Sequence, residues 1–189
     1  MLFRSDYIDV AGQSFRDLLA GKLSALPGTR ATISDWANHL STIFPEVRLK
    51  RYLEMRGADS GTLPNLLAVP ALWAGLLYDD ASLDAAWDLV KGWSTEDRQS
   101  LRDAVPKLAL AAMVRDRSVL EIAVEVLALA RAGLKRRNRC DLGGKDETRY
   151  LNVLETRLDR KTAPAQELLD KFHGPWRGSV DPIYADEAY

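Results

Sequence analysis

The stretch EVRLKRYLEMRGAD, residues 46–59, constrains the fold of this chain more than any other segment. Charged or polar residues alternate there with an apolar set, which comprises Val47, Leu49, Leu53 and Met55. Alternation with a period of two is typical of a β-strand that has one buried face. We therefore expect one long strand over residues 46–56, with an apolar face and a charged face.

The charged face of this expected strand carries a carboxylate and a guanidinium, Glu54 and Arg56. Residues two apart on a strand project to the same side, with Cα atoms roughly 7 Å apart. Magnesium prefers oxygen ligands and arginine pairs with phosphate in a bidentate manner, so this pair suits a metal–phosphate site. The alternative is an exposed ion pair on a solvated strand, which contributes only about 0–1 kcal/mol to stability.

Two neighbouring residues are further candidates for contact with a substrate. Tyr52 lies on the same expected face, and Asp59 follows the end of the strand. The alternatives are that Tyr52 packs as strand tyrosines commonly do, and that Asp59 is an ordinary turn residue.

Composition excludes several classes of protein. The 189 residues carry 26 Lys plus Arg against 27 Asp plus Glu, a net charge of −1, so nothing in the total charge indicates a nucleic-acid or membrane partner. No run approaches the roughly 20 apolar residues that span a bilayer, and the N-terminus lacks a signal-peptide core. A single cysteine, Cys140, excludes an internal disulfide and indicates a reducing environment. We expect a cytoplasmic protein.

Beyond residue 60 the pattern becomes helical. Ser118 and Glu121 have the spacing of a capping box, and the helix that they open is expected to run to about Arg137. Further helices are expected over residues 66–78, 82–93, 147–160 and 162–172. We expect the tail, residues 174–189, to lie extended against the body, and Trp73, Trp87 and Trp93 to lie in the core.

These patterns predict an α+β fold that is predominantly α-helical. A mixed region over residues 1–60 precedes a helical body over residues 61–189, and we expect 1–189 to form a single unit. A short strand over residues 3–10 and the long strand cannot form a stable sheet by themselves. The other strands of an antiparallel sheet are therefore expected from sequence absent here or from another chain, which predicts self-association through an uncovered sheet edge.

Several other candidate sites are rejected on sequence grounds. His39 and His173 have no second histidine at ligand spacing, and Cys140 is expected to be a plain loop thiol. Gly143-Gly144-Lys145 lacks the earlier glycine and the following Ser or Thr of a phosphate-binding loop. The basic cluster at residues 134–139 could bind nucleic acid, but at a helix end it more simply complements the helix dipole.

The order of several sequence blocks resembles the plant-type glutamate–cysteine ligases, which also occur in alpha-proteobacteria. The blocks are YIDVAGQSFRDLLAGKL, HLSTIFPEVRLKRYLEMRGAD, ALWAGLLYDD, DETRYLN and HGPWRGSVDPIYADEAY, and they extend over essentially the whole chain. The resemblance implies an ATP-dependent ligation, in which MgATP phosphorylates the γ-carboxylate of glutamate. The amine of cysteine then attacks the acyl phosphate and forms γ-glutamylcysteine, the first intermediate in glutathione biosynthesis.

The resemblance also implies roles for individual residues. Carried over to this chain, Glu54 is a magnesium ligand and Arg56 is a catalytic residue that faces the phosphates. The family's catalytic region is roughly twice this length, so the chain is expected to be an incomplete C-terminal portion. Its use of ATP, Mg²⁺, glutamate and cysteine then depends on the missing N-terminal half, and we expect the isolated chain to be inactive.

Two departures from the family pattern are visible. The family usually has Gly-Gly-Pro-Trp-Arg-Arg where this chain has Ser60-Gly61-Thr62-Leu63-Pro64-Asn65. The cysteine pair of the redox-regulated plant members corresponds to Val10 and Ala25, so no such switch is expected.

The alternative function is a non-catalytic helical interaction module.

Overall fold

The computed structural model describes residues 2–3 and 6–188, and the chain divides into two compact units, Met1–Ala58 and Asp59–Tyr189. The boundary lies beside residue 60, where the sequence pattern changes from mixed to helical. That the two units act as the single unit expected from the sequence stays a prediction.

In the described residues of the smaller unit there are two short helices and two small antiparallel strand pairs. Its elements are β1 (Leu2–Phe3), β2 (Asp6–Tyr7), α1 (Phe15–Ala20), α2 (Ile33–Ser41), β3 (Val47–Leu49) and β4 (Leu53–Met55). The single strand expected over residues 3–10 is wrong, because β1 and β2 pair with each other as two strands; residues 4 and 5 lie outside the described residues. Leu18 and Leu23 are buried and form the centre of this unit.

Local capping determines where the two helices of the smaller unit begin and end. The Ser14 hydroxyl accepts a hydrogen bond from the backbone N–H of Arg16 at the start of α1. The helix ends at Gly21, whose φ of 72° is left-handed and costs little without a side chain. Thr32 and Asp35 form a capping box at the start of α2.

The one long strand expected over residues 46–56 is wrong, because this segment reverses on itself as the β3–β4 hairpin. The pairs Val47–Met55, Arg48–Glu54 and Leu49–Leu53 lie opposite one another, and Arg51 is at the tip. Arg51 occupies a position at which the alternation would require an apolar residue, and an exposed charged side chain favours a turn there. In each pair the two residue numbers are both even or both odd. Even-numbered residues therefore still share one face of the hairpin, and odd-numbered residues share the other.

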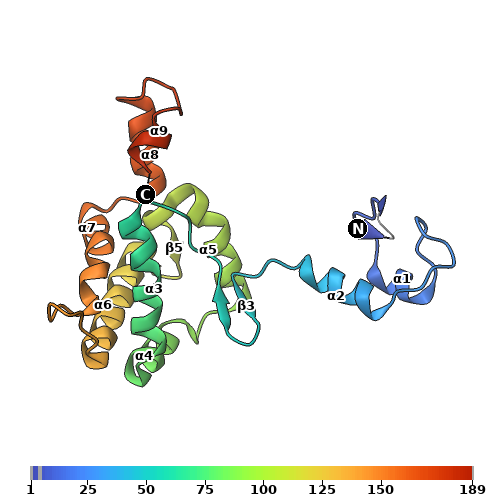
Figure 1. Cartoon of the computed structure of the whole chain (residues 1–189), viewed down its shortest axis with the longest axis horizontal. Coiled ribbons are helices and arrows are strands. Elements are labelled where there is room, and N and C mark those ends of the chain that lie inside the picture. The colour runs from blue at the N-terminus through green and yellow to red at the C-terminus, as the bar shows by residue number, and fades with distance from the viewer. Residues whose placement is uncertain (1, 4–5, 189) are drawn as a thin grey trace. The chain divides into compact units, whose positions relative to one another are not determined.

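The larger unit is mainly helical. Its helices are α3 (Leu63–Leu77), α4 (Asp80–Val90), α5 (Thr95–Leu108), η1 (Ala109–Ala111), α6 (Val119–Arg137), η2 (Glu147–Leu151), α7 (Asn152–Arg160), α8 (Pro164–His173) and α9 (Ile183–Asp186). One further hairpin joins β5 (Met113–Val114) to β6 (Arg117–Ser118). Helices α3, α6 and α7 lie side by side (Figure 1). The expected α+β, predominantly helical fold is confirmed.

Helix α6 confirms the prediction made from the capping box. The Ser118 hydroxyl accepts from the backbone N–H of Glu121, and the Glu121 carboxylate accepts from the N–H of Ser118. The helix runs to Arg137, where Asn138 takes a left-handed conformation. It packs on the core cluster, which comprises Ala71, Leu76, Leu127, Ala130, Leu134 and Leu151.

Helices α3 and α6 approach each other closely where two glycines meet. A Cβ atom added to Gly75 would overlap the backbone carbonyl of Ala130, and one added to Gly133 would overlap the carbonyl oxygen of Gly75. Because the obstructing atoms are backbone, no rotamer change relieves the overlap. Glycine at both positions is therefore a condition of this packing.

The apolar character of α3 reflects its place in this core. Among the described helices, none is by itself long and apolar enough to cross a membrane; α3 and α4 meet such a test only as a pair bent by 94°. Ala68, Ala71 and Leu76 on α3 are buried within the unit.

A polar network connects α4 to α6. The Arg136 guanidinium donates to both oxygens of Asp79, at 2.9 and 2.6 Å, and to the hydroxyl of Ser82. Ser82 is fully buried and donates to the carbonyl of Leu129 at 2.8 Å. Hydrogen bonds from Arg136 and from the Ser82 N–H hold the pKa of Asp79 well below its usual range.

This network predicts a loss of stability in acid. The pKa of Asp79 is lower in the folded state than in the unfolded state, near 3.9, so its contribution is complete above about pH 4 and declines below it. Asp79→Asn should lower the urea midpoint at pH 7, and its difference from the wild type should shrink at pH 3. Asp84→Asn on the same helix is the matched control and should show no such pattern. Equal differences at both pH values would contradict this role of Asp79.

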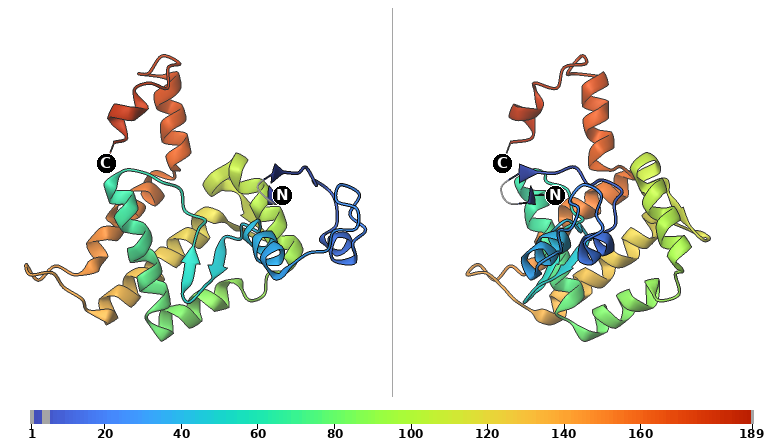
Figure 2. Two further views of the ribbon diagram at one scale, coloured as in Figure 1. Left: turned by 45° about the vertical axis from the view of Figure 1, so that its right-hand side comes forward. Right: turned by 90° about the vertical axis from the view of Figure 1, so that its right-hand side faces the viewer.

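The tail differs from the extended segment expected from the sequence. Residues 174–178 form turns, and α9 follows and lies beside α8 (Figure 2). Trp176 is only 7% exposed, and its indole N–H donates to Asp186 at 2.8 Å. The Nζ atom of Lys171 lies 5.6 Å from the Trp176 ring and pairs with Glu187. The tail folds back because this buries the Trp176 ring while its indole N–H keeps a hydrogen-bond partner.

Of the three tryptophans expected in the core, one is placed differently. Trp73 packs against the core cluster, and Trp93 is partly buried. The expectation for Trp87 is wrong, because its side chain is 59% exposed. Its position on α4 follows the apolar pattern of that helix, but the neighbouring elements of the larger unit leave it uncovered.

Candidate functional site

The charged face of the β3–β4 hairpin gathers three cations around one carboxylate. Oxygen Oε2 of Glu54 lies 3.6 Å from Nε of Arg48 and 3.4 Å from Nη1 of Arg56. Oxygen Oε1 lies 3.7 Å from Nζ of Lys50. The exposed fraction of the side chain is 29–30% for Arg48, Glu54 and Arg56 and 41% for Lys50, so the cluster is open to a ligand.

Pairing of the two strands explains this grouping. Arg48 lies directly opposite Glu54, and the N–H of Arg56 donates to the carbonyl of Glu46 at 2.8 Å at the open end of the hairpin. The structure thus brings Glu54 and Arg56 together, as the alternation predicted. Arg48 and Lys50 were not among the expected site residues. Both are even-numbered members of the same alternation, which could have identified them.

Two aromatic rings accompany the cluster. The guanidinium carbon of Arg56 lies 5.5 Å from the centroid of Phe44, and Nζ of Lys50 lies 5.8 Å from that of Tyr52. The face of an aromatic ring attracts a cation, so each of these contacts stabilises the charged group in its position above the ring. Tyr52 therefore lies on the charged face beside the tip, whereas Asp59 is the first residue of the larger unit and is not part of the hairpin.

The chemistry of this cluster suits an anion better than a metal ion. Three cations against one carboxylate leave an excess of positive charge, which attracts phosphate groups. Both oxygens of Glu54 face cations, and within residues 2–3 and 6–188 no three His, Cys, Asp or Glu side chains gather to hold a metal. These residues do not fit a self-contained magnesium centre. Glu54 can supply one oxygen ligand, with the others coming from phosphates or from other protein groups.

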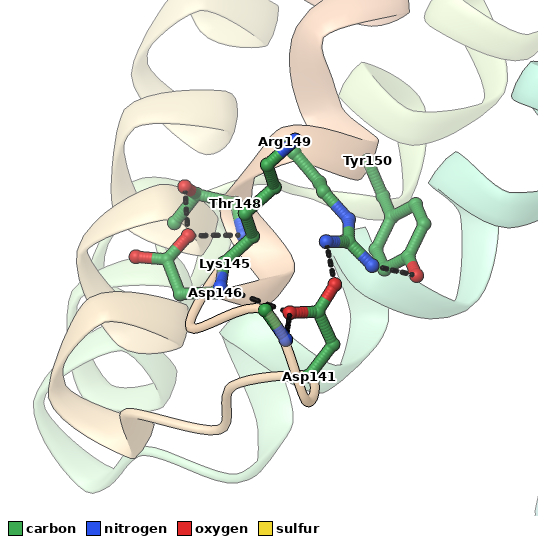
Figure 3. A network of polar contacts seen from close by, with 7 residues as sticks. Asp141, Lys145, Asp146, Thr148, Arg149 and Tyr150 are labelled. Carbon is green, nitrogen blue, oxygen red and sulfur yellow. Dashed lines mark hydrogen bonds and ion pairs between the residues drawn. The ribbon is translucent and has the colours of Figure 1, made fainter.

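The loop with Gly143-Gly144-Lys145 binds its own carboxylate (Figure 3). The Oδ1 atom of Asp141 accepts from the backbone N–H groups of Gly143 and Lys145 at 2.8 and 3.0 Å. Its Oδ2 atom accepts from Arg149, which also donates to the Tyr150 hydroxyl. The Arg149 guanidinium and these backbone groups lower the pKa of Asp141. Two amides that a phosphate-binding loop would offer to its ligand are therefore already used.

The basic cluster at residues 134–139 is engaged in structural contacts. Arg136 is bound to Asp79, while Arg137 pairs with Glu147 at 3.1 Å and lies 5.3 Å from the Tyr78 ring. Lys135, Arg136 and Arg137 form the last turn of α6, where cations complement the helix dipole. These contacts favour the structural interpretation of the cluster.

The segment that departs from the family pattern builds the start of α3. The amide of Asn65 donates to the Thr62 hydroxyl at 2.9 Å, and its carbonyl oxygen accepts from Arg157 on α7. Pro64 occupies the first turn, where its missing N–H costs nothing. In this chain the segment therefore has a local structural role.

Comparisons with known proteins cover nearly the whole chain. The model of glutamate-cysteine ligase family 2 matches residues 7–186. The chloroplastic glutamate–cysteine ligases of Nicotiana tabacum and Arabidopsis thaliana are both 47% identical to this chain over 186 residues. The aligned residues are 98% of this chain and 34% of each relative. Glutamate–cysteine ligase B of Oryza sativa subsp. japonica, also chloroplastic, is 45% identical over 183 residues, 97% of this chain and 36% of the relative.

The chain spans about a third of the length of these curated relatives. The match begins at residue 7 and ends at residue 186, so it includes both the charged hairpin and the helices of the larger unit. This chain belongs to glutamate-cysteine ligase family 2.

Proposed function

We propose that this chain supplies the C-terminal part of an ATP-dependent ligase of the plant type, which is also found in alpha-proteobacteria. The whole enzyme joins the γ-carboxylate of glutamate to the amine of cysteine, and glutamate, cysteine and ATP are its substrates. Family membership supports the reaction class, and the relatives are named as glutamate–cysteine ligases. The single observation that carries the site is the gathering of Arg48, Lys50 and Arg56 around Glu54.

In this proposal the hairpin contributes to the site for the phosphates of ATP. Arg56 is the catalytic residue, because a guanidinium can contact two phosphate oxygens and stabilise the charge that develops during phosphoryl transfer. Glu54 supplies one oxygen ligand to Mg²⁺, and the bound ion neutralises phosphate charge. Tyr52 is a candidate for substrate contact beside Lys50, and Asp59 is a candidate for positioning the segment that follows the hairpin.

The isolated chain is expected to have no ligase activity and to bind MgATP weakly. Three partly exposed cations attract phosphate, but ligand sites bury most of their ligand, and this open face cannot. Isothermal titration calorimetry with MgATP should therefore show affinity weaker than micromolar, which falls further as salt is added. Micromolar binding by the isolated chain would contradict the view that other parts of the enzyme complete the site.

The remaining parts of the proposal concern surroundings and partners. We propose a cytoplasmic enzyme that requires Mg²⁺ and has neither a nucleic-acid nor a membrane partner. The near-neutral charge and the structural contacts of residues 134–139 support the absence of a nucleic-acid partner. The relatives are named chloroplastic, so fractionation of the cells that produce this protein is the direct test of its location.

The alternative function is a non-catalytic interaction module that associates through the hairpin. The apolar face of the hairpin is largely uncovered in the smaller unit: Leu49 is 80% exposed, Leu53 55% and Val47 45%. Exposed apolar strands with free edges are typical sites of pairing with another chain. This observation favours self-association in the absence of nucleotide.

If this alternative is correct, the protein dimerises in a concentration-dependent manner. Sedimentation velocity at several protein concentrations should show the dimer, and Leu49→Lys should abolish it by placing a charge on the apolar face. Leu142→Lys is the matched control, because Leu142 is a fully exposed leucine in the larger unit. A monomer at all concentrations would exclude the alternative.

A further inference from the structure

We propose that a cavity in the smaller unit binds a small organic ammonium ion. The cavity has a volume of about 610 Å³, is partly open to solvent, and is lined by residues from α1, α2 and the loops around α1. Ligand pockets in proteins usually have volumes of about 300–1,000 Å³. The cavity is therefore large enough for a small molecule, and its walls indicate which class of molecule.

Two carboxylates line the cavity, Asp9 and Asp35. Oδ1 of Asp9 accepts from the N–H of Ala11 at 2.9 Å, and Oδ2 of Asp35 accepts from both the N–H and the hydroxyl of Thr32. The hydrogen bonds from Thr32 lower the pKa of Asp35, so this group is ionised at neutral pH. No lysine or arginine lines the cavity, and neither carboxylate is in an ion pair within the part of the chain that the structure describes.

The hydroxyl groups of the cavity also present acceptors. Ser41 donates its hydrogen to the carbonyl of Asn38 at 2.6 Å, and Thr42 donates to the carbonyl of His39 at 2.7 Å. Each hydroxyl oxygen therefore remains as an acceptor towards a ligand. Asn38 adds an amide that both donates and accepts, whereas Oε1 of Gln13 already accepts from the Ser24 hydroxyl at 3.0 Å. An ammonium group has three donors and no acceptor, and it matches such a wall.

An aromatic cluster supplies the apolar part of the site. The Phe15 and His39 rings line the cavity and are stacked with centroids 4.4 Å apart, while Trp36, which does not line it, packs 5.2 Å from Phe15. Leu18 and Leu23 line the same cavity and are buried. Ring faces and aliphatic side chains accommodate a short alkyl group, and the rings also attract a cation. The ligand class is therefore an ammonium ion on a short aliphatic chain.

This site differs from the charged hairpin in its residues and in the sign of its charge. None of its lining residues lies in the hairpin, and it carries carboxylates where the hairpin carries an excess of cations. The inference does not rest on ligase activity, so each proposal can fail without the other.

A titration of the 189-residue chain tests the inference. Butylammonium chloride is the probe, and butanol and sodium butyrate are its neutral and anionic matches. In ¹H–¹⁵N correlation spectra, butylammonium should shift the amides of Ala11, Asn38 and Thr42 in a saturable manner, while butanol does so at least about fivefold more weakly and butyrate not at all. Equal shifts from butanol, or no saturable shift with butylammonium, would overturn the proposal.

A charge-removing variant adds a second test. Asp9→Asn keeps an oxygen acceptor for the N–H of Ala11 and should weaken butylammonium binding about fivefold. Such a loss corresponds to one unit charge about 4 Å away in a medium of high dielectric constant. Asp17→Asn is the matched control, because Asp17 lies on α1 outside the cavity, and it should bind as the wild type does. Unchanged affinity in Asp9→Asn would show that the carboxylate has no part in binding.

Discussion

Replacing Arg56 with alanine, in a full-length ligase that carries this segment, is expected to lower kcat by about 10²–10³-fold. Removal of one preorganised donor to a developing oxyanion has an effect of that size in enzymes. The expected loss is in kcat more than in KM for ATP, because the charge on the transferring phosphoryl group grows in the transition state. Steady-state kinetics with varied ATP would measure both parameters.

Two further variants make this test specific. Arg56→Lys keeps the charge but not the bidentate geometry, so it should restore only part of the rate. Arg51→Ala removes the same type of side chain from the tip of the same hairpin, outside the cluster, and should retain most of the activity. Glu54→Gln should lower kcat by orders of magnitude if this carboxylate binds magnesium. A near-normal rate in either Arg56→Ala or Glu54→Gln would remove that residue from the site.

Replacing Gly133 with alanine is expected to destabilise the larger unit by about 2 kcal/mol or more. Helix propensity alone predicts the opposite, because alanine is favoured over glycine in a helix interior by about 1 kcal/mol. The added methyl group would overlap the carbonyl oxygen of Gly75, and separation of α3 from α6 would disrupt the core around Ala130 and Leu134. The sign of the change therefore distinguishes packing from propensity.

Chemical denaturation followed by circular dichroism would measure this effect. Ala128→Gly, at an exposed position of the same helix, is the control and should cost only about 1 kcal/mol through lost helix propensity. Gly75→Ala should resemble Gly133→Ala, because its methyl group meets the backbone of Ala130. A Gly133→Ala protein as stable as the wild type would show that the two helices can separate at little cost.

Helix α6 shows which parts of the fold could be predicted from the sequence. Its start depends on a side chain and a backbone N–H three residues apart, and this interaction is complete within one turn. Such short-range interactions have the same partners in any fold. The helical character of residues 61–189 could be predicted for the same reason.

The hairpin shows where prediction from the pattern was incomplete. Alternation assigns each side chain to a face, and that assignment survives a reversal at Arg51, because the paired residues have the same parity. At every position except Arg51, a continuous strand and a hairpin satisfy the pattern equally, so the alternation does not state where a strand ends. The exception at Arg51 was the available signal of the turn.

The sequence by itself determined the family, the predominantly helical class, the cap of α6 and the shared face of Glu54 and Arg56. These depend on matched residues, on helical or strand periodicity, or on neighbours a few positions apart. Only the tertiary structure decided the close contact of Gly75 with Gly133, the burial of Trp176, the exposure of Trp87, and the cavity lined by both Asp9 and Asp35. Each of these arises where segments distant along the chain meet, and a local sequence pattern does not predict which surfaces will be in contact.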